Sequence, residues 1–174
     1  MDAFVTYSLP IQGLKSGVHH FKFEVDDAFF AQFEDSPVQQ GKVLFELKLD
    51  KRPDMMLFDF TFEGSVKAEC DRCTATIDLP LEDERQLIVK FGEEEIETED
   101  EEVVFIQRDA PAFNVAKYLY EFVVLALPIT NTYDCENDPE PPCNFEVLKH
   151  LKTEEDKGNT SSIWDSLKDL NNDN

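Results

Sequence analysis

Residues 42–66 read KVLFELKLDKRPDMMLFDFTFEGSV, with apolar side chains alternating with polar ones on both sides of a Lys-Arg-Pro-Asp turn. A period of two is typical of a β-strand that buries one face and exposes the other. The connection is too short for the crossover that parallel pairing of two strands requires. The stretch therefore predicts an antiparallel β-hairpin with one apolar face.

The same alternation continues on both sides of this hairpin. Three further stretches show it, and we predict a strand in each: 19–25, 74–91 (long and bent) and 103–106. Consecutive strands with short connections favour antiparallel neighbours. We therefore expect an antiparallel meander, strongly twisted or partly closed.

Two helices are expected beside this sheet. Asp26 or Asp27 can cap a short N-terminal helix, because a carboxylate accepts hydrogen bonds from free N–H groups of the first turn. A second helix is predicted over 112–127, with Asp109 as its cap. Its residues are almost wholly apolar, which predicts burial on most of its circumference and packing against the sheet. The fold class is therefore α+β.

The length of 174 residues fits one domain with a tail. We place the domain at 1–151. A polar linker and a C-terminal tail helix follow at 152–174, and this segment carries the single tryptophan, Trp164. Residues 93–102 hold eight acids in ten positions, which predicts a solvated loop or a patch that holds a basic partner.

The charge balance is strongly acidic: 16 Lys and Arg against 38 Asp and Glu give a net charge of −22. Nonspecific affinity for nucleic acid comes from Lys and Arg that displace counterions from phosphates, so we do not expect a broad DNA-binding surface. The balance fits a protein that meets a basic partner or uses one local patch. Lys67 and Arg72 are the best local cations for a phosphate contact, and Trp164 is a candidate partner contact.

No segment resembles a secretory leader or a membrane anchor. The first residues, MDAFVTYSLPIQGL, lack a continuous apolar run, and no apolar stretch approaches the roughly 20 residues of a spanning helix. We therefore expect a cytoplasmic protein, in which thiols or a metal site are favoured over structural disulfides.

The four cysteines form two pairs, Cys70 with Cys73 and Cys135 with Cys143. Two thiolates three positions apart across a tight turn can bind one tetrahedral ion, so the pattern is consistent with one structural zinc held by all four thiolates. His150 is an alternative ligand to one of the later thiols. Two pairs of unmetallated thiols fit the same sequence. Strands flank the first pair on both sides, unlike a thioredoxin-type redox site, which begins a helix.

Catalytic signatures are missing from the sequence. It has no G-x-S-x-G, no phosphate-binding G-x-x-x-x-G-K, no G-x-G-x-x-G and no H-E-x-x-H. Carboxylates are so abundant that any pair chosen as acid and base would be arbitrary. We therefore expect that the protein is not an enzyme.

Several features occur in an order that resembles the YceD-like family of large ribosomal RNA subunit accumulation proteins. They are Gly13-Leu14-Lys15-Ser16-Gly17 before an aromatic strand, the corner Cys70-Asp71-Arg72-Cys73, an acidic loop, a helix that runs into Leu127-Pro128 with a cysteine soon after, and Trp164-x2-Leu167-x2-Leu170. The second cysteine pair is wider here than the tight cluster of family members with a full set.

The resemblance implies a non-enzymatic role in ribosome biogenesis, through accumulation or processing of large-subunit rRNA. The expected partner is a large-subunit precursor, met through its rRNA or through a basic ribosomal protein, and the acidity favours the protein route. We expect a monomer that binds neither DNA nor membranes. The alternative is a metal- or thiol-dependent enzyme in RNA maturation.

Overall fold

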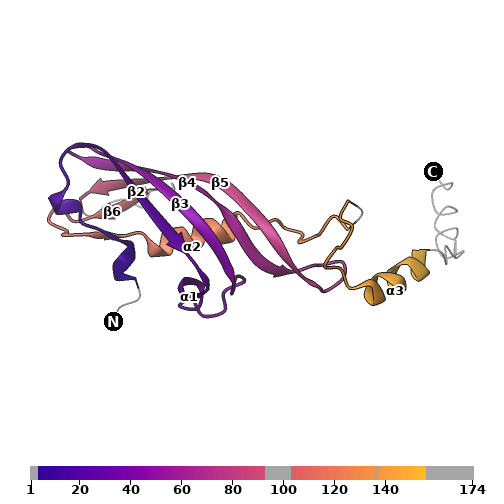
Figure 1. Cartoon of the computed structure of the whole chain (residues 1–174). Coiled ribbons are helices and arrows are strands. Elements are labelled where there is room, and N and C mark those ends of the chain that lie inside the picture. Colours follow the sequence, from indigo (N-terminus) through magenta and orange to yellow (C-terminus); the bar gives the residue numbers. More distant parts are fainter. Residues whose placement is uncertain (1–3, 93–102, 136, 156–174) are drawn as a thin grey trace, which may run out of the picture.

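The computed structural model describes residues 4–92, 103–135 and 137–155 of the chain. A five-stranded sheet runs along the length of this part (Figure 1). In spatial order its strands are β2 (Gly17–Val25), β3 (Gly41–Lys51), β4 (Met55–Glu69), β5 (Thr76–Phe91) and β6 (Val103–Ile106). The fold is α+β with a mostly antiparallel, open sheet, so the predicted fold class is confirmed.

The hairpin predicted at 42–66 forms the centre of the sheet as β3 and β4. Phe45 lies opposite Phe62 and Leu47 lies opposite Phe60, so their side chains share one face. All inward-facing apolar residues of this hairpin are buried: Val43, Phe45, Leu47, Leu49, Met56, Phe58, Phe60, Phe62 and Val66. The alternation of the sequence therefore decides which face of the sheet forms the core.

The strand β6 departs from the expected meander, because it runs parallel to β5. Ile88 is registered with Val103 and Phe91 with Ile106. Strand β6 returns in the direction of β5 after residues 93–102, so a longer connection replaces the tight turn of a hairpin. The acidic segment 93–102 itself lies outside the described residues.

The helix α2 (Ala116–Leu125) packs on the buried face of the sheet, as expected. The ring of Phe122 meets that of Phe60 edge to face, with 5.2 Å between centroids, and the side chain of Leu119 is 0% exposed. Leu125, 64% exposed, and Lys117 are the exposed residues of this helix, and the others are buried or half-buried. The prediction of burial on most of the circumference is therefore confirmed.

The start of this helix also differs from the prediction of 112–127. Strand β7 (Phe113–Asn114) pairs with β1 (Ser8–Leu9), and this pairing holds 113–114 in an extended conformation. The helix therefore starts at Ala116, whose N–H donates to Oδ1 of Asn114 over 2.9 Å. The expected cap, Asp109, lies well before the helix and takes no part in it.

The N-terminal segment packs against β2 and the short helix α1 (Asp27–Phe30), because the ring of Tyr7 contacts those of Phe23 and Phe29. The predicted cap is confirmed, because Oδ1 of Asp26 accepts a hydrogen bond from the N–H of Phe29 over 3.1 Å. Two 3-10 turns, η1 (Val5–Tyr7) and η2 (Ile11–Gly13), precede β2. The Tyr7 and Phe29 rings lie 4.9 Å apart, which ties the N-terminus to α1.

The helix α3 (Phe145–Glu155) was not predicted from the sequence. It lies beyond the end of the sheet (Figure 1). Its last four residues fall within the segment 152–174 that the sequence predicts as a polar linker and tail helix. The rest of the tail, with Trp164 and the predicted tail helix, lies outside the described residues. None of the described helices is long and apolar enough to cross a membrane.

Candidate functional site

A tight corner joins β4 to β5 and contains the first cysteine pair. The N–H of Cys70 donates to the carbonyl of Ala75, and the N–H of Thr74 donates to the carbonyl of Cys70, each over 2.8 Å. Thr74 has a φ of 59°, in the left-handed region that such a corner requires. Both cysteine side chains are 1% exposed. The corner therefore holds two buried thiols at the end of the sheet.

The segment that carries the second cysteine pair docks onto this corner. The backbone N–H of Asp71 donates to the carbonyl of Asn131 over 2.8 Å, and the N–H of Asn131 donates to Oδ2 of Asp71 over 2.6 Å. Nη2 of Arg72 lies 3.7 Å from Sγ of Cys135, to which it donates. These three contacts hold residues 131–135 against the corner.

The sulfur of Cys70 receives several hydrogen-bond donors. Its burial by itself raises the thiol pKa, but backbone N–H groups of Arg72, Cys73 and Tyr133 and the Cys73 side chain outweigh this and hold the pKa of Cys70 below its ordinary value. Donors around a sulfur favour the thiolate, which is the form that binds metal ions. These hydrogen bonds tie the Cys70 sulfur to its own corner and to Tyr133 of the docked segment.

The second pair differs from the expectation of free thiols or metal ligands, because Cys135 and Cys143 form a disulfide. The loop between them brings their Cα atoms to 6.7 Å, within reach of a disulfide. Cys70 and Cys73 are free. In the described part of the chain, no group of three or more His, Cys, Asp or Glu side chains is arranged to hold a metal. The four-thiolate zinc site stays a prediction, and the oxidised second pair could not supply its ligands.

The structure does not bring the predicted binding residues together. Arg72 turns toward Cys135, and Nζ of Lys67 forms an ion pair with Asp78 over 2.7 Å. Both cations therefore already have a partner within the chain. The third candidate, Trp164, lies outside the described residues.

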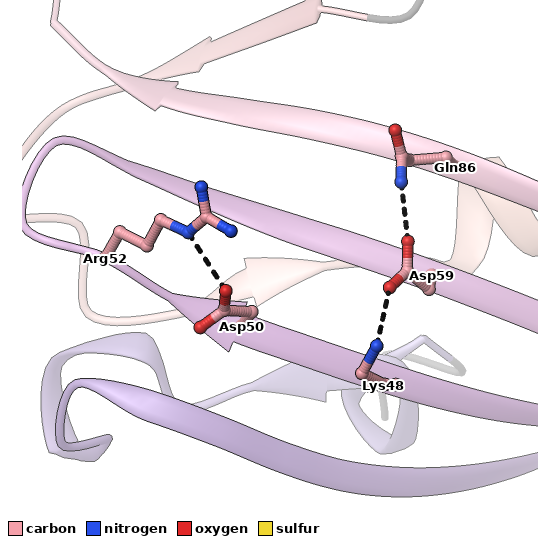
Figure 2. Close-up of polar contacts among 5 residues, drawn as sticks. All are labelled: Lys48, Asp50, Arg52, Asp59 and Gln86. Carbon is pink, nitrogen blue, oxygen red and sulfur yellow. Dashed lines mark hydrogen bonds and ion pairs between the residues drawn. The ribbon is translucent and has the colours of Figure 1, made fainter.

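Sequence reasoning missed the polar face of the sheet as a candidate site. On this open face, Oδ1 of Asp59 accepts from Nε2 of Gln86 over 2.6 Å, and Oδ2 accepts from Nζ of Lys48 over 3.3 Å (Figure 2). The hydrogen bond that Gln86 donates, together with that from Lys48, lowers the pKa of the Asp59 carboxyl. Arg52 and Asp50 form a second contact near the turn, over 2.9 Å (Figure 2).

The open face is also hollowed. A hollow of about 900 Å³ lies over the middle of β2 to β5, and its lining includes His20, Lys22, Glu46, Thr61 and Glu84. The alternation of each strand could have located these outward-facing residues. The register across four strands, which decides their neighbours, is not readable from any one strand.

Comparison with protein families gives one finding. A family model described as "Large ribosomal RNA subunit accumulation protein YceD" matches residues 58–171, which is well over half of the chain. The matched region includes most of β4, all of β5 and α2, and all four cysteines. Neither the curated proteins nor the solved structures compared with the chain gave a match.

Proposed function

The chain belongs to the YceD family of large ribosomal RNA subunit accumulation proteins, and we propose that it acts in the cytoplasm by binding a large-subunit precursor, without catalysing a reaction. The family match over residues 58–171 is the observation that carries this proposal. It supports a role in the accumulation of large-subunit rRNA. The mode of action and the partner are our inference.

Burial of the cysteine corner supports binding over catalysis. A catalytic thiol needs access to its substrate, whereas the side chains of Cys70 and Cys73 are 1% exposed. The hydrogen bonds of the two cysteines and the docking of residues 131–135 are consistent with a structural role for this corner at the end of the sheet. The alternative, a metal- or thiol-dependent enzyme in RNA maturation, would require this corner to open.

The electrostatics support contact with a basic ribosomal protein. The net charge of −22 repels a phosphate backbone, and the two best cations, Lys67 and Arg72, already have partners within the chain. An acidic chain can neutralise the Lys and Arg of a ribosomal protein before they reach rRNA. Direct rRNA contact is the competing route.

A structural zinc ion that stabilises the corner would be compatible with this function. Cys70 and Cys73 would supply two thiolates, and Cys135 and Cys143 would supply the others after reduction of their disulfide. A closed four-thiolate site leaves no open position for a substrate. The bound ion would link residues 131–143 to the end of the sheet.

Sedimentation through a ribosome gradient tests the binding role. At low salt we expect the full chain to migrate with immature large subunits, and at high salt to leave them, because exposed charges are screened. Depletion of the protein should lower large-subunit rRNA relative to small-subunit rRNA. Absence from every ribosomal fraction at low salt, together with unchanged rRNA levels, would overturn the proposal.

A Cys70→Ser variant separates the binding role from the enzymatic alternative. If the corner is structural, the variant loses stability, and any bound metal is lost with it. If the corner is catalytic, the variant keeps its fold but fails to restore rRNA maturation in depleted cells. Circular dichroism and metal analysis of the purified variant, beside the cellular rRNA profile, distinguish the two.

A further inference from the structure

The open face of the sheet has a trough along its strands. The packed elements α2 and β7 lie on the opposite, buried face, where Phe122 contacts Phe60 and Phe113 contacts Phe58. Three adjoining hollows of about 900, 510 and 730 Å³ follow one another on the open face. We name them together the open-face trough; its outward side chains include Lys22, Leu44, Glu63, Glu82 and Glu84.

Unpaired acids line one wall of this trough. Glu63 on β4 lies directly opposite Glu82 on β5, and Glu84 lies opposite Thr61 in the next outward row. All three glutamates are exposed, and none joins an ion pair with another residue of the described part of the chain. Like charges that face each other across two strands destabilise a sheet. The sheet therefore carries a repulsion that a basic ligand would relieve.

The unpaired negative charge is limited to the β4 and β5 side of the trough, because the acids toward β2 are in ion pairs. Toward the edge strand β2, Lys22 pairs with Glu46 over 2.5 Å, and Lys42 pairs with Glu24 over 3.0 Å. Leu44 of β3 lies opposite Glu63 of β4, and the Leu44 side chain is 45% exposed. The unpaired acids thus lie beside one exposed apolar side chain in a hollow.

We propose that the open-face trough binds an extended Lys- and Arg-rich segment of a protein. Its basic side chains would neutralise Glu63, Glu82 and Glu84, and one apolar side chain would cover Leu44. Residues 80–86 of β5 border the trough, which at about 3.3 Å per residue gives a length of about 20 Å, enough for roughly six extended residues. This inference rests on the proposed function, since a basic ribosomal protein would supply the segment.

The same charges argue against two other occupants. A phosphate backbone would meet Glu63, Glu82 and Glu84 without a free cation to offset them, because the lysines that line the trough (Lys22, Lys42 and Lys48) are in ion pairs. A second copy of this chain would bring its own acids against the same row. A basic peptide is the occupant whose charge is complementary.

Binding of a synthetic peptide tests the proposal. The probe is a short peptide rich in Lys and Arg with one central Leu, and its control has Gln at every basic position. At low salt the triple variant Glu63→Gln, Glu82→Gln, Glu84→Gln should bind the basic peptide about tenfold more weakly than the unmodified chain. The matched variant Glu34→Gln, Glu69→Gln, Glu140→Gln has the same net charge and should stay within about twofold.

Backbone amide shifts of the full chain on titration with the basic peptide should locate binding on β3 to β5. Equal weakening in both triple variants, or shifts confined to another surface, would overturn the trough as the site. If naked large-subunit rRNA binds more tightly than the peptide, and the peptide displaces it, the trough would be assigned to RNA instead. A trough variant that still migrates with large subunits and supports rRNA accumulation would refute this inference alone and leave the proposed function standing.

Discussion

The guanidinium of Arg72 lies 3.7 Å from the sulfur of Cys135, and so connects the β4–β5 corner to a loop more than sixty residues later in the chain. This contact turns the best candidate for a phosphate contact toward another segment of its own chain. It also places the second cysteine pair beside the first. The corner is therefore an internal junction in the structure, and the open face of the sheet becomes the stronger candidate for an external partner.

Loss of the Arg72 side chain should loosen this junction without weakening RNA contact. In Arg72→Ala we expect faster proteolysis within 131–143, because the loop then loses one of the contacts that dock it onto the corner and keeps those between Asp71 and Asn131. Binding to naked large-subunit rRNA should stay within about twofold of the unmodified chain. Limited proteolysis and filter binding measure the two effects. A large loss of rRNA affinity with an unchanged cleavage rate would favour direct RNA contact through Arg72.

The metal content of the reduced protein should depend on the buried pair. After reduction and incubation with zinc, we expect about one ion per chain, lost in Cys70→Ser, because structural zinc requires thiolates. Without reduction, the Cys135–Cys143 disulfide should prevent four-thiolate binding. Elemental analysis after gel filtration gives the stoichiometry. Zinc bound equally by the reduced chain and by Cys70→Ser would refute a site at this corner.

Acid should remove the contribution of Asp59 to stability. Hydrogen bonds from Gln86 and Lys48 lower the pKa of this carboxyl in the folded state, so its stabilisation is complete above the unfolded value and is lost as the pH falls through the folded one. The advantage of the unmodified chain over Asp59→Asn should therefore be constant near neutrality and shrink below about pH 4. Urea unfolding at several pH values measures it. An advantage that grows on acidification would contradict the assigned sign.

Two leucines of α2 should respond very differently to charge. Leu119→Lys should unfold the protein, because its side chain is fully buried and a lysine there would be an unpaired buried charge. Leu119→Ala should lower the free energy of unfolding by about 2–5 kcal/mol. The control on the same helix, Leu125→Lys, should change it by less than about 0.5 kcal/mol, because Leu125 is exposed. Similar losses for Lys at both positions would mean that both sides of α2 are packed.

Gly64 should tolerate no side chain. A Cβ built on it would lie 2.2 Å from the carbonyl oxygen of Lys42 and 2.6 Å from Cα of Val43, so β3 would have to move away. We expect Gly64→Ala to destabilise the fold by about 1–3 kcal/mol or more. In contrast, a Cβ at Gly13 meets nothing within 4 Å, and Gly13→Ala should be nearly neutral. Thermal unfolding of the two variants compares them, and equal melting temperatures would show that the strands separate without cost.

The central sheet can be predicted from local sequence pattern. Strict alternation over 42–66 decides both the hairpin and its buried face, because successive side chains of a strand point to opposite sides. The Asp26 cap and the β4–β5 corner were equally local, since each depends on residues within a few positions of one another. Such features need no knowledge of distant segments.

The start of α2, the direction of β6 and the neighbours within the site depend instead on contacts between distant segments. Residues 113–114 are extended because they pair with β1, about a hundred residues earlier, and this partner overrides their place in an apolar helical pattern. Arg72 meets Cys135, and Glu63 faces Glu82, through the docking of a distant loop and the register between two strands. Periodicity gives the face on which a side chain lies. Its neighbour there depends on long-range pairing, which local sequence does not encode.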